Sequence, residues 1–207
     1  MKERNHRRGG ETAAEDRKSR SHEKIQGAAA RLLRRDGIGG ASVRRVMAAA
    51  GMTGGGFYAH FPSKVKLTQE AFSWAAREKR RVLSVTLGDA RGASYIDRFL
   101  RAYLTPDHRD DLQTGCPYAA LLSELPRSSR AVRSRVREEF SRGVKAFAER
   151  LQGRQPSEAR EKAILVLCLA FGALAMSRTL ADFPEGNEVL DLAGAAAKYF
   201  KGVKSRS

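Results

Sequence analysis

Side chains able to do covalent or metal chemistry are few in this sequence, and their spacing fits no catalytic motif. The two cysteines, Cys116 and Cys168, fit no metal-ligand pattern, and a disulfide scaffold would need more of them. His108 has Asp110 and Asp111 nearby but no second His or Cys at ligand spacing, so we expect a solvated loop there. No Ser, His and Asp set belongs to a recognisable motif. We therefore expect no enzymatic activity, no metal and no cofactor.

Cys116 is the one residue with two competing interpretations. It lies in a Gly115-Cys116-Pro117 step at a predicted helix N-terminus, where the helix dipole can lower the pKa of a thiol and make it reactive. The alternative is a buried small hydrophobe that opens the helix, which we favour because free Cys is among the most buried residue types. Cys168 lies within an apolar helix and is expected to be inert.

The elements that would position a functional surface begin with residues 42–61. Ser42 is a candidate N-cap, and Val46 and Met47 continue the apolar face of a short helix. Gly51 follows directly, where a left-handed residue is needed to close that helix and turn the chain. These signals predict one short helix followed by a tight turn.

A second short helix is predicted after the turn, with Thr53 as its candidate cap and Pro62 as its end. Its aromatic residues divide between two faces, with Phe57 and Phe61 inside and Tyr58 and His60 outside. Two short helices joined by a glycine turn and surrounded by Arg and Lys are typical of a helix-turn-helix that reads DNA.

The same stretch resembles the DNA-binding signature of the TetR/AcrR family of bacterial repressors. The resemblance rests on Gly51-Met52-Thr53, Gly55, Phe57 to Phe61, Ser63-Lys64 and Leu67, and it covers roughly residues 23–68. It implies an all-helical, homodimeric transcriptional repressor that a ligand releases from DNA, with a phosphate contact at Lys64. The Gly-Cys-Pro step also resembles one branch of the family, in which some members sense electrophiles or oxidants through a cysteine.

The residues expected to contact DNA come from both short helices and from the start of the helix that follows. They are Ser42, Arg44, Thr53, Gly54, Gly55, Gly56, Tyr58, His60 and Lys64. The family usually carries a polar side chain at the position of Gly54, so this sequence departs from the family in its direct readout of bases. Three successive glycines also predict a helix that is frayed in isolation, at a cost of about 1 kcal/mol each relative to Ala.

The composition and charge of the chain limit its possible binding partners and its cellular compartment. The 207 residues carry 39 Lys and Arg against 23 Asp and Glu, a net charge of +16, which predicts a polyanionic partner such as nucleic acid. The first 24 residues are charged and polar, unlike a signal peptide, so we expect the protein to be located in the cytoplasm. The longest apolar run, residues 163–176, is shorter than the roughly 18 residues of a membrane span, so we expect a soluble protein.

The predicted fold class is all-α, in three segments. Residues 1–20 are expected to form a disordered basic arm, either a solvated tail or an arm that reaches DNA. Residues 21–66 form the helix-turn-helix DNA-binding domain, and residues 67–207 form a helical effector-binding and dimerisation domain. The two short helices within residues 42–61 are the reader helices. The other helices that we expect cover residues 23–36, 63–85, 93–104, 116–125, 128–151, 157–180 and 187–200.

The C-terminal helices are expected to bind an effector and a second copy of the chain. The residues that could line an effector pocket are Trp74, Phe99, Tyr103, Cys116, Tyr118 and Phe140, although each would serve equally well as ordinary core. The helix over residues 157–180 is hydrophobic nearly all round, so it should be buried on more than one side. Together with residues 187–200, it could build a four-helix dimer interface.

The sequence favours a dimeric, operator-binding repressor released by a small-molecule or reactive effector. Three other readings stay open. The first is a basic protein that coats DNA without sequence preference. The second is a helical protein that binds membrane surfaces through its basic faces. The third is a ligand-binding or enzymatic bundle with a vestigial DNA domain, which the glycine-rich second helix keeps in play.

Overall fold

The computed structural model describes residues 3–151 and 155–200, and within them every regular element is helical. The predicted all-α class is confirmed. The α-helices are α1 (Glu3–Gly40), α2 (Val43–Ala49), α3 (Lys64–Leu87), α4 (Gly92–Tyr103), α5 (Pro106–Asp110), α6 (Pro117–Leu121), α7 (Arg130–Ala148), α8 (Pro156–Thr179) and α9 (Pro184–Gly194). Three short 3₁₀-helices complete the list: η1 (Gly54–Ala59), η2 (Leu125–Arg127) and η3 (Ala196–Phe200).

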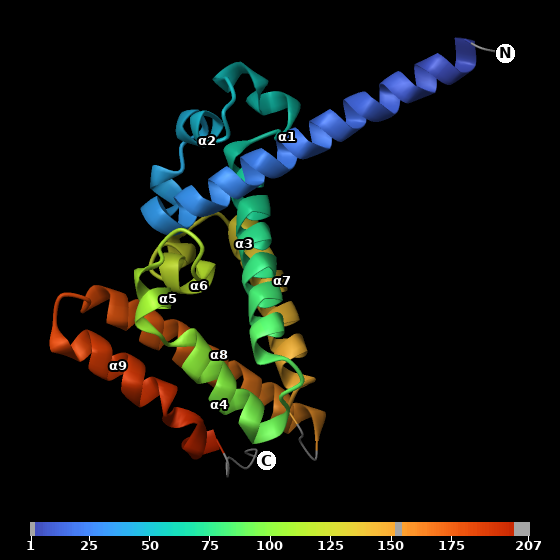
Figure 1. Ribbon diagram of the computed structural model, residues 1–207. Helices are drawn as coiled ribbons and strands as arrows, with labels where there is room; N and C mark the ends of the chain where they lie inside the picture. Colours follow the sequence, from blue (N-terminus) through green and yellow to red (C-terminus); the bar gives the residue numbers. More distant parts are fainter. Residues whose placement is uncertain (1–2, 152–154, 201–207) are drawn as a thin grey trace.

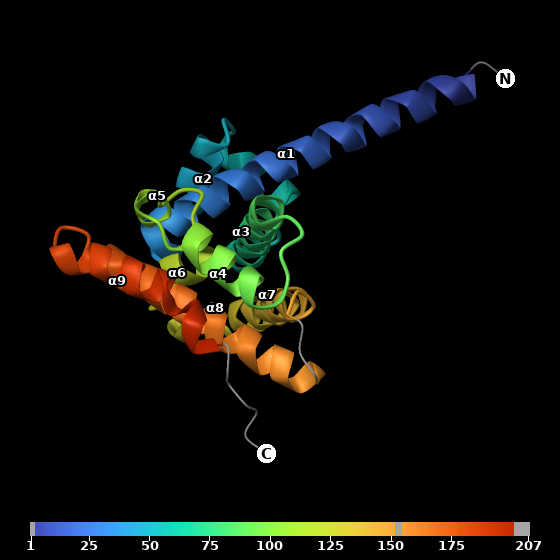
Figure 2. The same ribbon diagram turned by 60° about the horizontal axis from the view of Figure 1, so that its bottom comes forward.

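The helices form two groups joined by α3 (Figure 1). One end of the molecule, the reader end, consists of the later part of α1, α2, η1 and the first turns of α3. At the other end α4 and α7 pack against α3, and α8 and α9 lie beyond them, side by side in both views (Figures 1 and 2). The short α6 packs against α1, α3 and α8, so it lies between the two groups.

Each group has its own hydrophobic core, and α3 contributes to both. Phe72 and Ala76 belong to the first core, whereas Leu87 belongs to the second. Residues from beyond α3 also enter the first core, including Leu121 of α6 and Val132 of α7. The division into domains at residues 66 and 67 stays a prediction, and residues from beyond position 67 belong to the first core as well as to the second.

The N-terminal arm differs from the sequence prediction. Residues 1–20 were expected to be disordered, but α1 is helical from Glu3 and projects away from the rest of the chain as one long rod (Figure 1). Extending a helix that is already nucleated adds one hydrogen bond for each residue fixed, whereas nucleation is the costly step. Residues 25–33 nucleate α1 by packing into the first core, and the Ala, Arg, Lys and Glu residues before them favour continuation.

Gly37 interrupts α1, as its sequence position predicts. Its φ of 75° and ψ of 179° lie outside the helical region, so the first long segment of α1 ends just before it. The carboxylate of Glu124 lies against Gly37, where any side chain would collide with it. Glu124 Oε2 also accepts a hydrogen bond from the Ile38 N–H at 2.9 Å. Gly37 thus brings the reader end of the chain close to the segment that follows α6.

The bridge between Ile38 and Glu124 gives a first testable effect. Glu124→Ala is expected to lower the free energy of unfolding by about 1–2 kcal/mol, because a partly buried backbone N–H loses its acceptor. Urea denaturation followed by circular dichroism measures the loss. Glu124→Gln is the matched control, since its amide oxygen can still accept from Ile38. Equal losses in the two variants would show that the carboxylate charge, and not the hydrogen bond, stabilises the contact.

α3 presents a different face to each core, so one apolar stripe does not stay buried along its whole length. Val82 and Val85 are apolar, but they are 45% and 75% exposed. Leu83 and Leu87 pack against the second core instead. A helix that leaves one core and enters another changes the face that it buries, so a single stripe drawn along its whole length misplaces the later positions.

α8 has one buried face and one exposed apolar face. Ala163, Val166 and Leu174 lie in the second core, whereas Leu165 and Met176 are about half exposed. Cys168, which was expected inside the apolar helix, is also exposed. Among the described residues α8 alone has the length and composition of a membrane-spanning helix, which is weak evidence because the core helix of a soluble protein has both.

Candidate functional site

The first reader helix is built as the sequence predicts. Ser42 has an extended backbone, and its Oγ accepts a hydrogen bond from the N–H of Arg45 at 3.3 Å. Gly51 has a φ of 71°, the left-handed conformation expected for the turn. The Met52 N–H then bonds back to the Met47 carbonyl at 2.9 Å, which closes the end of α2. The predicted cap at Ser42 and turn at Gly51 are confirmed.

The second reader helix is η1, a 3₁₀-helix in place of the α-helix that was expected. Thr53 stands at its N-cap position with an extended backbone but makes no side-chain capping bond. Glycine has the lowest helix propensity apart from proline, and 3₁₀ geometry occurs in short pieces of this kind. Phe57 and Phe61 are fully buried and stack with ring centroids 5.8 Å apart, so their predicted inward direction is confirmed. These two rings hold η1 against the first core.

The residues predicted to contact DNA gather at one end of the molecule, on α2, η1 and the start of α3 (Figure 1). Five of them are exposed to solvent, namely Arg44, Thr53, Gly54, Gly55 and Tyr58. The other four are partly buried: Ser42, Gly56, His60 and Lys64. Tyr58 is 77% exposed, and a Cβ added at Gly54 or Gly55 would meet only open space. The surface is therefore open and poor in side chains.

Lys64 is placed by a confirmed cap. Ser63 precedes α3 with an extended backbone, and its Oγ accepts from the Lys66 N–H at 3.1 Å. Lys64 is thus the first residue of α3, where free backbone N–H groups and the helix dipole attract anions. A phosphate at this end would meet both the helix N-terminus and the Lys64 ammonium.

His60 is less available than the sequence suggests. Its ring lies 6.2 Å from that of His22, and its Nδ1 is buried without a hydrogen-bond partner among the described residues. Burial, with His22 and Lys18 nearby, lowers the pKa of His60, so the ring is neutral at pH 7. His22 itself is tied to Glu70 at 2.8 Å. His60 could reach DNA only through its exposed edge.

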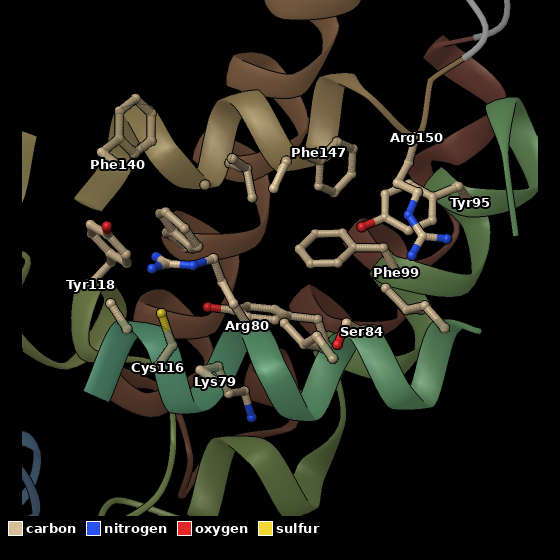
Figure 3. Close-up of a pocket in the computed structure, with 18 of the residues that line it drawn as sticks. Lys79, Arg80, Ser84, Tyr95, Phe99, Cys116, Tyr118, Phe140, Phe147 and Arg150 are labelled. Carbon is tan, nitrogen blue, oxygen red and sulfur yellow. The ribbon is translucent and has the colours of Figure 1, made fainter. Parts of the chain in front are cut away.

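A cavity of about 320 Å³ lies between α3, α4, α6, α7 and α8 (Figure 3). Five of the six predicted pocket residues line it: Phe99, Tyr103, Cys116, Tyr118 and Phe140. Trp74 does not line it, and that assignment is wrong. Trp74 packs against the first core beside Gly27 of α1, and it lies two residues before Ala76, the first residue of α3 that lines the cavity. When one helix contributes to two cores, the sequence does not show which of them an aromatic residue on that helix packs into.

The sequence reasoning missed several lining residues. Phe147, Phe171, Tyr95, Arg80 and Arg150 were not singled out as pocket residues, yet all five line the cavity. Arg80 is held in place by Glu139, whose Oε2 accepts from its Nη2 at 2.6 Å. Glu139 is a fully buried carboxylate in the middle of α7. A buried acid facing an Arg of a neighbouring helix has no local sequence signal.

Cys116 is buried, and the structure favours the unreactive interpretation. Its side chain is 2% exposed, and burial raises the pKa of the thiol. α6 opens at Pro117 as predicted, but it has only five residues, so the dipole available to lower the pKa of Cys116 is small. A protonated, shielded thiol is a poor nucleophile. Cys116 instead forms part of the cavity wall.

His108 is a buried structural residue, which corrects the solvated loop expected there. It lies in α5 at 6% exposure, and its Nδ1 lies 2.6 Å from the carbonyl oxygen of Tyr103. Its Nε2 accepts the N–H of Cys116 at 3.2 Å, so Nδ1 carries the proton and donates to Tyr103. The imidazole therefore joins the end of α4 to the start of α6. Within the described residues, no group of three or more His, Cys, Asp or Glu side chains is placed to hold a metal ion.

A chain of contacts connects the cavity with the reader end through α6. Arg34 of α1 is buried, and its Nη1 bonds to Glu78 at 3.1 Å and to the carbonyl oxygen of Gly115 at 3.4 Å. Gly115 precedes Cys116, which lines the cavity, and Glu124 after α6 bonds to Ile38 of α1. The segment from 115 to 124 is therefore held at both ends by α1.

Comparisons with known proteins agree with this architecture. A model described as "Bacterial regulatory proteins, tetR family" matches residues 25–71, which span the reader. A model of the "Transcriptional regulator LmrA/YxaF-like, C-terminal domain" matches residues 93–186, which contain most of the cavity walls. A search of curated proteins finds no match.

Solved structures share the whole fold at low sequence identity. A TetR transcriptional regulator from Chloroflexus aurantiacus is 23% identical, with a TM-score of 0.70 over 88% of this chain and 96% of that one. A TetR-family regulator from Cytophaga hutchinsonii is 18% identical, with a TM-score of 0.71 over 91% and 98%. The reduced form of NemR from E. coli is 19% identical, with a TM-score of 0.69 over 86% and 95%.

The two sequence models together cover most of the described chain; the first match ends within α3, and the second begins in α4. The fold found in the solved structures has the same order, with a helix-turn-helix end followed by a helical bundle. On the match to these two family models, this chain is a member of the TetR family of bacterial transcriptional regulators.

Proposed function

We propose that this regulator is a homodimeric repressor that binds a pseudo-palindromic operator and is released from it by a small molecule in the cavity. The observation that carries the proposal is the α6 segment, which lines the cavity at Cys116 and is bonded to the reader end at Gly115 and Glu124. A ligand that displaces α6 would change the position of α1 and with it the reader.

The reader supplies the proposed DNA contacts. In a helix-turn-helix dimer the second helix of each copy enters one major groove, and the two half-sites lie about 34–36 Å apart. Tyr58 and Thr53 are exposed on η1, Arg44 is exposed on α2, and Lys64 begins α3. We expect these residues to contact phosphates, because Gly54 to Gly56 leave few side chains able to reach base edges.

The exposed apolar faces of α8 and α9 support the proposed dimer. Leu165 and Met176 of α8 and Leu192 of α9 are about half exposed or more, and α8 and α9 pack side by side. A second copy that pairs its α8 and α9 with these helices would form a four-helix interface and bury them. A protein of this kind acts in the cytoplasm and carries out no catalysis.

The test of DNA binding is a selection from a random pool of double-stranded DNA with the purified protein at near-physiological salt. A recovered palindrome with half-sites about one helical turn apart is the expected result, and its affinity should fall steeply as salt rises, because phosphate contacts release counterions. Binding without any enriched sequence would contradict the repressor. It would favour the second candidate, a basic protein that coats DNA indifferently, to which the glycine-rich reader surface also points.

The release mechanism predicts how the ligand and the operator affect each other. A ligand that binds the DNA-free conformation more tightly must weaken operator binding by the same factor by which the operator weakens ligand binding. Titrating ligand into the free protein and into the protein–operator complex measures both factors. A ligand that binds the free protein and the protein–operator complex with the same affinity would contradict release by that ligand.

A further inference from the structure

The cavity has an aromatic wall, and at one end its hydrogen-bonding groups include more donors than acceptors. Its rings come from α4, α6, α7 and α8, and they include Tyr95, Phe99, Tyr118, Phe147 and Phe171. Phe99 and Phe147 meet edge to face with centroids 4.9 Å apart in the middle of the cavity (Figure 3). Walls of this kind favour a flat, ring-containing ligand, because aromatic faces and edges pack best against another ring.

The end of the cavity beside α6 contains donors that lack partners. The hydroxyl groups of Tyr103 and Tyr118 are both buried and make no hydrogen bond within the described residues. Tyr103 is 1% exposed, and the thiol of Cys116, a weak acceptor, interacts with its hydroxyl. Burial raises the pKa of both phenols, so both keep their protons at neutral pH. Two buried O–H donors therefore face this end.

Arg80 adds further donors there. Figure 3 shows its guanidinium next to Tyr118, whereas the Lys79 ammonium points away from the rings. Two of the guanidinium N–H groups bond to Glu139, at its side chain and its backbone carbonyl, which leaves three of the five. The Glu139 carboxylate also binds Arg142 at 2.6 Å, so its charge is more than balanced by two arginines. This end of the cavity is rich in donors and carries a net positive charge.

A surplus of donors selects a ligand group that has acceptors only. A carboxylate offers about four lone-pair sites and no hydrogen, so it can accept from both phenols and from Arg80, whereas an amide, an alcohol or a neutral phenol would bring further donors to a place whose own acceptors are the phenol oxygens and a weak thiol. From this arrangement we infer that the ligand of the cavity is an aromatic carboxylate, with its rings packed against Phe99 and Phe147 and its carboxylate beside Tyr103, Tyr118 and Arg80. The inference rests on the proposed effector role of this cavity and names its chemical class.

The test compares two probes of nearly the same shape. 2-Naphthoate and 2-naphthamide differ in that the amide brings two N–H donors and no charge. Isothermal titration of the free protein should show 2-naphthoate binding at least tenfold more tightly than the amide. The Tyr103→Phe/Tyr118→Phe double variant should lower that preference below threefold, because both rings remain and only the donors are lost. Tyr95→Phe is the matched control, since its hydroxyl lies at the other end of the cavity (Figure 3).

Several outcomes would overturn the inference. The amide binding as tightly as the carboxylate would remove the donor argument, and so would a double variant that keeps the wild-type preference while melting at the wild-type temperature. Failure of both probes to bind at millimolar concentration would also refute it. None of these measurements contains DNA, so they are independent of operator selection. A protein that selects an operator but prefers the amide would keep the proposed function and lose only the ligand class.

Discussion

Replacing Phe57 with alanine is expected to remove about 3–5 kcal/mol from the free energy of unfolding of the reader end, and to abolish operator binding with it. Phe57 is fully buried and stacks on Phe61. It lies in η1, directly after the three glycines Gly54 to Gly56. Three glycines give η1 almost no stability of its own. Its place against the first core therefore depends on these two rings.

The neighbouring aromatic residue is the control. Tyr58 is 77% exposed, so Tyr58→Ala should change the free energy of unfolding by no more than about 0.5 kcal/mol. We expect it to weaken operator binding nevertheless, because Tyr58 is the large side chain that projects from η1. Urea denaturation and fluorescence anisotropy with the selected operator measure the two effects on the same protein samples.

The pair of variants separates folding from recognition. Hydrogen exchange of residues 42–62 shows whether the Phe57→Ala loss is confined to the reader or spreads to the whole chain. A Phe57→Ala protein that keeps both its stability and its operator affinity would show that η1 is not held by the first core. A Tyr58→Ala protein with unchanged affinity would remove Tyr58 from the proposed DNA contacts and leave Arg44, Thr53 and Lys64 to carry them.

The features that could be predicted from the sequence are those decided by neighbours along the chain. Ser42 and Ser63 cap helices because a hydroxyl reaches a backbone N–H three residues on. Gly51 turns the chain because a left-handed φ suits glycine. The inward direction of Phe57 and Phe61 follows from their spacing. These local rules placed the reader, and the family resemblance rests on the same residues.

The sequence predictions fail where contacts between distant parts of the chain determine the structure. Residues 3–20 continue a helix that is nucleated further along the chain, and Trp74 belongs to the other of the two cores that α3 serves. Glu139 faces Arg80 across two helices, and no spacing within either helix signals that contact. His108 was placed in a loop because it is surrounded by polar residues, yet its ring lies between Tyr103 and Cys116. Most of the aromatic lining of the cavity could be predicted, but the groups that give it chemical character could not.

His108 leads to the second large effect, which is a pH dependence of stability. Burial lowers its pKa from 6.5 to about 4, and the nearby charges of Lys79 and Arg178 act in the same direction. Protonation would also place a hydrogen on Nε2, which accepts the N–H of Cys116 in the folded chain. The folded state therefore excludes the proton, whereas the unfolded state binds it below about pH 6.5.

The sign of the effect follows from proton binding. Between pH 6.5 and 4 the unfolded chain carries a proton on His108 that the folded chain lacks, so stability is complete at neutral pH and falls as the pH falls. The slope approaches about 1.4 kcal/mol per pH unit, and the loss reaches roughly 3 kcal/mol by pH 4. His60, whose pKa is also lowered, contributes in the same direction. The carboxylates with lowered pKa values, such as Glu139, lose their contribution only at more acidic pH.

His108→Gln isolates the term that belongs to His108. The glutamine amide can still donate and accept but does not titrate, so the difference in unfolding free energy between the two proteins should shrink steadily as the pH falls from 7 to 5. Urea denaturation at half-unit steps measures it, and His60→Gln gives the contribution of the other histidine. Parallel curves for the wild type and His108→Gln would show that His108 is protonated as easily in the folded chain as in the unfolded one. The junction between α4, α5 and α6 would then have to be open to water, and the link from the cavity through Gly115 to Arg34 would lose the rigid support that the proposed release mechanism requires.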